Sequence, residues 1–269
     1  MPHLRSVSLR ATPGPDQAER FPFSVPLVRE LGQIELSPTV TFLVGENGSG
    51  KSTLLEGIAL AAALPTVGSV NTELDETLTA QRLLSKSLSL TWNRRTKRGF
   101  FLRAEDFFGF TKALAKLRSE MLAGLAQVEA DYANRSAHAK GLARMPFATS
   151  LAEMERRYGV DLDASSHGQS FLKLFQSRFV PGGLYVLDEP EAPLSPQSQL
   201  ALMMMIGEML KQDAQFIIAT HSPILLGYPD ATIYSCDRVP IERMEFDELE
   251  AVALTRDFLN GRERFLRHL

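Results

Sequence analysis

The stretch Thr39-Val-Thr-Phe-Leu-Val-Gly-Glu-Asn-Gly-Ser-Gly-Lys-Ser-Thr53 decides the fold of this chain. Its first six residues are β-branched and apolar, which is typical of a buried strand. Residues 45–52 form a glycine-rich loop that ends in Lys-Ser, and the residues that follow to position 63 are rich in helix formers. A strand, a glycine-rich turn and a helix start together form the context in which such a loop binds phosphate.

The chemistry of this loop follows from its backbone. Its glycines let successive N–H groups point at phosphate oxygens, and the helix N-terminus adds positive potential. Lys51 can reach the β- and γ-phosphates of a nucleoside triphosphate, and the Ser52 hydroxyl can ligate Mg²⁺. We therefore expect a set of nucleotide-binding residues in and just after the loop, namely Gly45, Glu46, Asn47, Gly48, Ser49, Gly50, Lys51, Ser52 and Thr53.

Composition limits the class of protein. The 269 residues are 44% hydrophobic and 23% charged, as in an ordinary globular chain, and the net charge of −3 gives no global basic field for nucleic acid or anionic lipid. The single cysteine, Cys236, excludes an internal disulfide, and as a small buried hydrophobe it fits a reducing compartment. No apolar run approaches the ~20 residues that span a bilayer, and the N-terminus lacks the pattern of a secretory signal. We expect the cytoplasm.

Strand and helix signals alternate along most of the chain. Residues 3–10 and 21–25 read as extended, and strands are predicted at 184–187, 215–219 and 232–235, with helices at 168–178, 196–211 and 247–258. This alternation predicts an α/β fold: a mainly parallel sheet of the P-loop NTPase type flanked by helices, preceded by an N-terminal antiparallel β section.

Two further segments interrupt this pattern. Ser87–Trp92 alternates, 93–99 turns, and the chain resumes at Phe100, which predicts a β-hairpin whose tip carries Arg94-Arg-Thr-Lys-Arg98. A solvated turn and a contact to a phosphate backbone are both compatible with this basic tip. Helical spacing at 111–132 and 150–158 predicts an inserted helical lobe at 105–160, and the lack of repeated heptads excludes a long coiled-coil arm. We expect one domain, 1–269.

Carboxylates end the strand Gly183-Leu-Tyr-Val-Leu-Asp-Glu-Pro190. A strand that terminates in Asp places that side chain at the carboxyl edge of a parallel sheet, where ligands bind. There Asp188 can hold the Mg²⁺ that bridges the phosphates, and Glu189 can act as general base toward water. His221 follows another apolar strand and can hydrogen-bond a γ-phosphate and sense its loss.

These motifs, taken in order, resemble those of the ATP-binding-cassette superfamily of ATPases. The resemblance rests on the phosphate loop, on Asp188-Glu189, on His221, and on Ser165-Ser-His-Gly-Gln-Ser170. Alone, this last segment is a weak signal, because it is compatible both with a helix cap and with an anion site at a helix N-terminus. Within the superfamily the chain looks closest to small bacterial AAA-family ATPases, relatives of the heads of DNA-repair and chromosome-maintenance ATPases.

The resemblance implies a composite site. In that superfamily two copies pair head to tail around two ATP molecules, so the signature-like residues Ser166, His167, Gly168 and Gln169 of one copy would contact the nucleotide bound by the other. Pro190-Glu-Ala-Pro-Leu-Ser195 looks like the loop that meets its counterpart across such a dimer. Closure would depend on the γ-phosphate, so hydrolysis would loosen the dimer.

Several positions depart from the superfamily pattern. His167 stands where the first signature glycine is usual, and no glutamine lies in a lid-loop context. Arg103 or Glu105 occupies that region instead. For the aromatic side chain that stacks on adenine, Phe21 and Phe23 are candidates, although packing in the core explains either of them as well.

Three functions remain open at this stage. The leading hypothesis is an ATPase that dimerises on Mg-ATP and couples hydrolysis to conformational change in a protein partner or DNA. The alternative is the nucleotide-binding subunit of a membrane transporter, against which stand the altered signature and the missing lid glutamine. The third, a regulatory binder with negligible turnover, has little need for Glu189.

Overall fold

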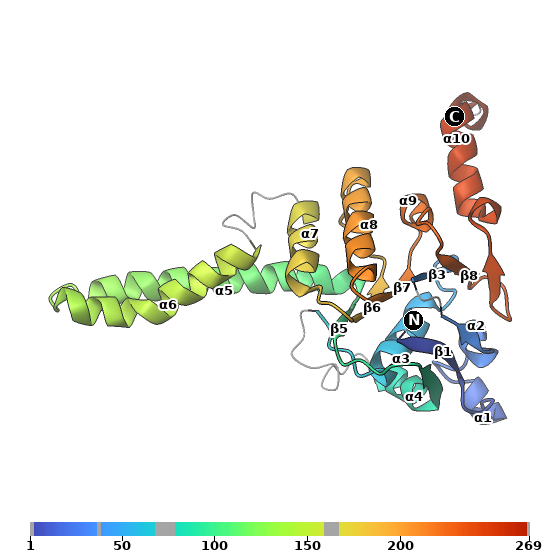
Figure 1. The fold of residues 1–269 in the computed structure, drawn as a ribbon, viewed down its shortest axis with the longest axis horizontal. Coiled ribbons are helices and arrows are strands. Elements are labelled where there is room, and N and C mark those ends of the chain that lie inside the picture. The colour runs from blue at the N-terminus through green and yellow to red at the C-terminus, as the bar shows by residue number, and fades with distance from the viewer. Residues whose placement is uncertain (1–2, 37–38, 68–78, 159–166, 268–269) are drawn as a thin grey trace.

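The computed structural model describes residues 3–36, 39–67, 79–158 and 167–267, and Figure 1 shows their arrangement. The strands are β1 (Leu4–Leu9), β2 (Ile34–Glu35), β3 (Val40–Val44), β4 (Leu88–Trp92), β5 (Gly99–Leu102), β6 (Leu184–Asp188), β7 (Gln215–Ala219), β8 (Thr232–Ser235) and β9 (Glu242–Met244). The helices are α1 (Pro15–Ala18), α2 (Pro26–Arg29), α3 (Lys51–Ala61), α4 (Thr79–Ser87), α5 (Ala104–Asp131), α6 (Ala137–Tyr158), α7 (His167–Arg178), α8 (Pro196–Leu210), α9 (Pro223–Leu226) and α10 (Glu250–Leu266), with a 3₁₀ turn η2 (Phe246–Glu248).

A six-stranded sheet in the order β5-β6-β7-β3-β8-β9 forms the centre of the fold. Its neighbours pair in parallel except for β8 and β9, which are antiparallel. Every residue of β3, β6 and β7 is buried, as expected for strands covered by helices on both faces. The predicted mainly parallel α/β fold is confirmed, and so are the strands expected at 184–187, 215–219 and 232–235.

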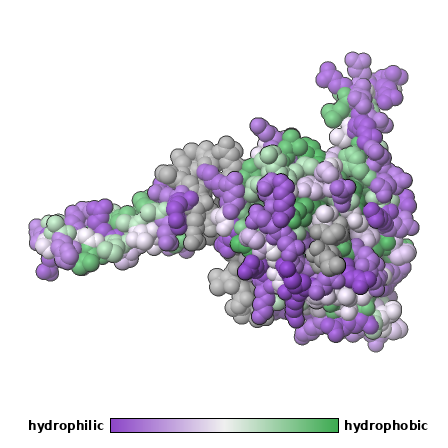
Figure 2. Space-filling view, in the orientation of Figure 1, coloured by the Kyte–Doolittle hydropathy of each residue, from purple (hydrophilic) through white to green (hydrophobic). Residues whose placement is uncertain are grey.

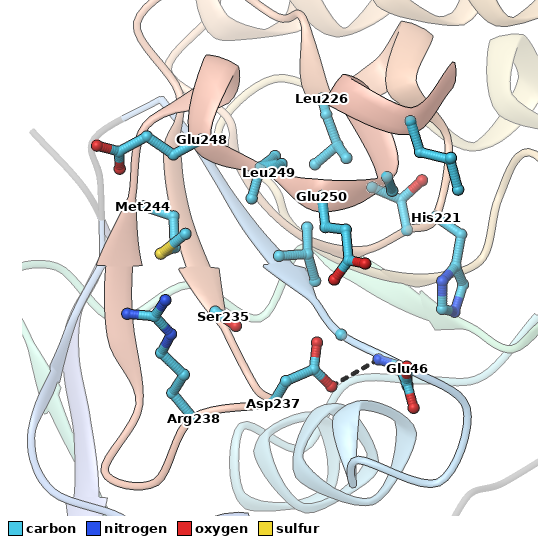
Figure 3. Close-up of a pocket in the computed structure, with 15 residues that line it drawn as sticks. Glu46, His221, Leu226, Ser235, Asp237, Arg238, Met244, Glu248, Leu249 and Glu250 are labelled. Carbon is cyan, nitrogen blue, oxygen red and sulfur yellow. Dashed lines mark hydrogen bonds between the residues drawn. The ribbon is translucent and has the colours of Figure 1, made fainter. Parts of the chain in front are cut away.

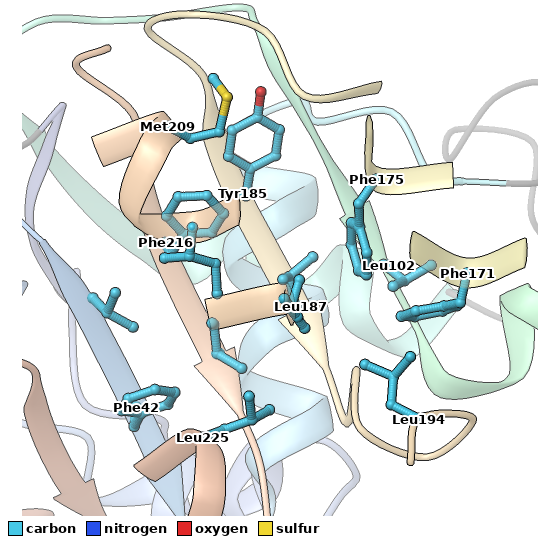
Figure 4. Packing of buried hydrophobic residues seen from close by; sticks show 14 of the residues in the cluster. Phe42, Leu102, Phe171, Phe175, Tyr185, Leu187, Leu194, Met209, Phe216 and Leu225 are labelled. Carbon is cyan, nitrogen blue, oxygen red and sulfur yellow. The ribbon is translucent and has the colours of Figure 1, made fainter. Parts of the chain in front are cut away.

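Alternate residues of these strands feed two cores. Phe42, Tyr185 and Phe216 face one side, where they pack with α7 and α8, and Figure 4 shows this cluster with its aromatic rings. Leu43 and Ile217 face the other side, toward α3 and the small antiparallel sheet. Successive side chains of a strand point to opposite faces, so each strand contributes to both cores. Packing on both faces of the sheet therefore fixes the strand ends that carry the site.

A second sheet, β2-β1-β4, joins the N-terminal strands β1 and β2 to β4 and is antiparallel as predicted. The extended conformation expected at 21–25 is wrong, because this segment is a turn that leads into α2. The hairpin expected between 87 and 104 is also wrong. β4 pairs with β1 in the small sheet, whereas β5 joins the large sheet in parallel with β6.

Burial explains where β5 goes. Phe100, Phe101 and Leu102 are all buried, which requires cover on both faces that the rim of a two-stranded hairpin does not supply. The linker between the sheets is fixed to the body, since Thr96 Oγ1 donates to Gly182 O over 2.9 Å and Arg94 Nη2 lies 2.7 Å from Asp213 Oδ2. The basic segment is therefore a connection between two sheets and not a hairpin tip.

The helices α5 and α6 form an antiparallel pair, the helical arm (104–158), which projects from the body in Figure 1. The prediction of a lobe without an arm, drawn from the missing heptads, is wrong. Contacts other than heptad packing hold α5 and α6 together. The ring of Phe147 packs so closely on Gly124 that a Cβ at position 124 would lie 2.4 Å from it, and Glu129 pairs with Lys140 and Arg144. Figure 2 shows its surface as a mixture of hydrophilic and hydrophobic residues. The division of the chain into one domain with this insert stays a prediction.

None of the helices in the described ranges combines the length and the apolar composition that crossing a bilayer requires.

Candidate nucleotide-binding site

The glycine-rich loop connects the end of β3 to the first turn of α3, as the sequence predicts. Gly50 adopts a positive φ of 99°, and a Cβ there would lie 2.6 Å from Val25 Cγ1, so this turn requires glycine. Gly50 is also the N-cap of α3, so the cap residue has no side chain that could accept from the first N–H groups of that helix. The loop therefore presents the positive end of a helix to an anion.

Lys51 lies along the inside of this loop. Its side chain is buried, and Nζ donates hydrogen bonds to Gly45 O at 2.7 Å and to Glu46 O at 2.9 Å. A buried ammonium needs such partners. Phosphate oxygens would be stronger acceptors at the same place, so the lysine is held ready for an anionic ligand.

Strand register brings the predicted carboxylates to the same edge. Asp188 at the end of β6 is directly opposite Ala219 of β7, and Ala219 is in turn opposite Leu43 of β3. The ends of β6 and β3 thus flank the end of β7, which places Asp188 near the start of α3, where the Ser52 hydroxyl hydrogen-bonds its carboxyl group.

The carboxyl group of Asp188 is in an unfavourable place for a lone charge. Burial raises its pKa to about 6; the Ser52 hydrogen bond and Lys51 counteract the rise, while Glu189 and Glu191 add to it. Its Oδ1 atom is buried, and no hydrogen-bond partner for it exists among the described residues. A divalent cation would stabilise the charged form and give Oδ1 a partner.

Ser52 and Asp188 therefore fit the two protein ligands expected for Mg²⁺. One hydroxyl and one carboxylate are few ligands, and in the described ranges no group of three or more His, Cys, Asp or Glu side chains could hold a metal on its own. Such a small number of protein ligands is typical of Mg²⁺ sites, where one or two carboxylates bind the ion and phosphate and water complete its coordination shell.

Glu189 and His221 face each other beyond Asp188. Glu189 has a left-handed backbone with φ of 47°, and its N–H donates to Ala219 O over 2.9 Å. Its Oε1 lies 3.4 Å from His221 Nε2, and both side chains are more than one-third exposed. The two residues predicted to activate water and to sense the γ-phosphate are thus neighbours, and water can reach both.

Glu191 holds the histidine segment in place, a contact that sequence reasoning missed. Its Oε1 accepts hydrogen bonds from Thr220 Oγ1 at 2.6 Å and from the His221 N–H at 2.7 Å. Thr220 is fully buried, so this carboxylate ties the loop that follows Asp188 to the end of β7. The position of Glu191 in the acidic segment after β6 was a signal, but nothing local to the sequence identifies its partners.

Two hollows flank the loop. One, of about 290 Å³, is lined on the side of α3 by Phe21, Val25, Asn47, Gly48, Gly50, Lys51, Ser52, Thr53 and Glu189. The other, of about 400 Å³, lies between the loop start, His221 and α10, and Figure 3 shows Glu46, Asp237, Glu250 and His221 around it. The smaller hollow contains most of the predicted nucleotide-binding residues.

The structure separates the two aromatic candidates. Phe21 is half exposed and lines the smaller hollow next to the loop. Phe23, only two positions on, is buried in the core with α3 and the small sheet. Phe21 therefore stays a candidate for stacking on adenine, and packing accounts for Phe23.

The signature-like residues lie elsewhere. Ser166 is outside the described residues, and His167, Gly168 and Gln169 form the first turn of α7. Figure 1 places α7 beside α8, where the two helices also make contact, and apart from α3. Within one chain the described part of the signature, residues 167–169, is not brought to α3.

Of the two lid candidates, the structure describes the side chain of Arg103 alone. Arg103 is buried and pairs with Asp106 at the start of α5, with Nη2 and Oδ1 2.9 Å apart. It caps the first helix of the arm, which is a structural role. The Glu105 side chain lies outside what the structure describes, so a lid function for it stays a prediction.

Two family models match the chain. One, described as "AAA domain", covers residues 24–87, and the other, described as "AAA domain, putative AbiEii toxin, Type IV TA system", covers residues 169–227. The first segment contains the glycine-rich loop, and the second contains Asp188, Glu189 and His221. No curated protein matches the chain.

Solved structures match along almost the whole chain. An SMC head domain from Pyrococcus furiosus, with an extended coiled coil and bound to the C-terminal domain of ScpA, has 12% identity and a TM-score of 0.44 and covers 96% of this chain and 100% of its own. The ATP-binding cassette of an ABC transporter in its ADP conformation has 16% identity and a TM-score of 0.47, with coverage of 95% and 99%. An SMC head domain from Thermotoga maritima has 15% identity and a TM-score of 0.40, with coverage of 90% and 99%.

Proposed function

We propose that this chain binds Mg-ATP and hydrolyses it to ADP and phosphate. Its motifs, its AAA-domain matches and its mainly parallel sheet agree with the ABC-type ATPase superfamily. One observation carries the proposal: β6 and β7 end in register, and this brings Asp188, Glu189 and His221 together at the edge next to the phosphate loop. A protein that only binds nucleotide has no need for an exposed carboxylate at this point.

The residues divide the work among themselves. The N–H groups of the loop and of the first turn of α3 bind the β- and γ-phosphates, and Lys51 leaves the carbonyl oxygens of Gly45 and Glu46 to join them. Ser52 and Asp188 would hold Mg²⁺, which when bound neutralises charge that develops on the phosphate oxygens. These contacts fix the γ-phosphate in front of Glu189.

Glu189 then acts on the attacking water. As an exposed carboxylate at the mouth of the site, it accepts a proton from water as the oxygen attacks the γ-phosphorus in line with the leaving ADP. His221, whose Nε2 lies 3.4 Å from Glu189, hydrogen-bonds a γ-phosphate oxygen and keeps the carboxylate oriented. Proton transfer to Glu189 ends its charged contact with His221, and loss of phosphate ends the hydrogen bond between His221 and the γ-phosphate.

We further propose that the working site contains two chains. The first turn of α7 carries His167, Gly168 and Gln169 apart from α3 of the same chain, so these residues would reach nucleotide only on a second copy. Ser166 would complete this contact. A head-to-tail homodimer closed by ATP and loosened by hydrolysis would pass conformational change to a protein partner or to DNA, and the unpaired cysteine fits the cytoplasm as its location.

A direct experiment follows from the place of Lys51. The Lys51→Met variant keeps most of the length and loses the charge, and it should lower phosphate release from ATP by at least about 100-fold. Wild type should release phosphate in the presence of Mg²⁺, and its rate with and without DNA identifies or excludes DNA as an effector. Wild type that binds ATP without turnover would overturn the proposal.

A further inference from the structure

The turn after β8 lies against the start of the phosphate loop. Cys236 N–H donates to Val44 O over 2.7 Å, which extends the pairing of β8 with β3 to the last residue before the loop. Asp237 comes next, and its Oδ1 accepts a hydrogen bond of 2.7 Å from the Glu46 N–H, drawn as a dashed line in Figure 3. A carboxylate distant in sequence thus binds the second residue of the loop.

Gly45 is shaped around this carboxylate. Its φ of 154° is a conformation that residues with side chains rarely adopt. A Cβ there would lie 2.8 Å from Asp237 Oδ1 and 2.9 Å from Ser49 Oγ. Asp237 is therefore packed on the backbone of the loop, and the first glycine of the motif leaves room for it.

Two side chains hold the Gly45–Glu46 segment. Lys51 binds the carbonyl oxygens of Gly45 and Glu46, and Asp237 binds the intervening N–H. If Lys51 turns to phosphate when nucleotide binds, the carbonyl oxygens of Gly45 and Glu46 lose their side-chain donor, and Glu46 O keeps the backbone N–H of Ser49 at 3.2 Å. Asp237 then remains as the side chain that fixes this end of the loop.

We propose that Asp237 is a positioning residue of the nucleotide site, which holds the entry of the phosphate loop in its binding conformation through the Glu46 N–H. The inference rests on the proposed nucleotide binding and adds to it a residue outside all four motifs. The contribution is largest with nucleotide bound, because Lys51 shares the task only in the empty loop.

Two substitutions separate the hydrogen bond from the charge. Asp237→Ala removes the acceptor and should weaken the binding of a fluorescent ADP analogue, measured with Mg²⁺, by about tenfold or more. Asp237→Asn keeps a carbonyl oxygen for the Glu46 N–H and should bind within about threefold of wild type. Asp247→Ala is the matched control, because Asp247 lies in η2, is exposed and pairs with Arg256.

The melting temperatures of all variants without nucleotide accompany the titration. If Asp237 only stabilised the fold, Asp237→Ala would have a lower melting temperature, and Asp237→Asn would not recover the affinity for the ADP analogue. Affinity of Asp237→Ala equal to that of wild type, or an equal loss in Asp237→Asn, overturns the positioning role while nucleotide binding itself stands. Wild type that binds no ADP analogue overturns both.

Discussion

Glu189 Oε1 lies 3.4 Å from His221 Nε2, and the two residues come from the ends of neighbouring parallel strands. Their contact depends on the register of β6 with β7 and on the left-handed turn at Glu189, which sends its N–H to Ala219 O. The proposed base and the proposed phosphate sensor therefore form one unit, and a change in the position of one alters the other.

Glu191 should set the position of this unit without touching substrate. Glu191→Ala removes the acceptor of both the Thr220 hydroxyl and the His221 N–H, so His221 loses its fixed place. We expect turnover to fall about tenfold with Mg-ATP affinity within about threefold of wild type, because a hydrogen bond to a charged group contributes about 1.5–3 kcal/mol. Steady-state kinetics and an ADP titration measure the two effects.

Glu208→Ala serves as the control for this prediction, since Glu208 is an exposed acid on α8 that pairs with Lys211. Glu191→Gln, which keeps one acceptor oxygen, should recover part of the rate. Equal loss of affinity and rate in Glu191→Ala would assign it a general structural role instead.

Asp188 should make the stability of the empty protein depend on pH. Burial raises its pKa from 3.8 to about 6, so the folded state resists ionisation of this carboxyl. Above pH 6 the charged carboxylate destabilises the fold by about 3 kcal/mol, and the cost is relieved as the pH falls from 6 toward 3.8. Asp188→Asn should therefore be more stable than wild type at pH 7.5, by an amount that falls to about half at pH 5.

Chemical denaturation without Mg²⁺ and nucleotide measures this difference. Mg²⁺ with a nucleotide should reverse the order, because the Asn side chain lacks the charge that holds Mg²⁺ and the wild type therefore gains more stability from binding. A stability gap that is the same at both pH values would show that the buried charge of Asp188 is not its cause.

Phe21 and Phe23 should respond to truncation in opposite ways. Phe21→Ala removes a half-exposed ring beside the loop and should weaken ATP binding by roughly three- to tenfold, with little change in stability. Phe23→Ala opens a cavity in the core and should lower the free energy of unfolding by about 3–5 kcal/mol. Nucleotide titration and denaturation of both variants test the pair, and unchanged affinity in Phe21→Ala would exclude stacking on adenine.

Much of this site was predictable because its parts are local in sequence. Composition and spacing alone predict the strand, loop and helix of residues 39–63 and the strand that ends at Asp188. Parallel strands then place their carboxyl ends at one edge, so the neighbourhood of Asp188, Glu189 and the loop follows from the fold class alone.

What could not be predicted depends on contacts between distant segments. Asp237 reaches Glu46 because β8 pairs with β3, and no local pattern encodes that pairing. The chain between β4 and β5 changes sheets, although its sequence reads like a hairpin turn. Phe21 and Phe23 differ only in burial, which tertiary packing decides.

In the proposed reaction Glu189 drives ATP hydrolysis in a site closed by two chains. The most direct test compares wild type, Glu189→Gln and the control Glu208→Gln in one experiment that follows phosphate release and molar mass with Mg-ATP. We predict that Glu189→Gln lowers turnover by at least about 100-fold and remains a dimer for as long as ATP is present, whereas wild type dimerises transiently. Normal turnover in Glu189→Gln would contradict the role of Glu189. A molar mass that stays at that of one chain when Mg-ATP is added would contradict the site of two chains.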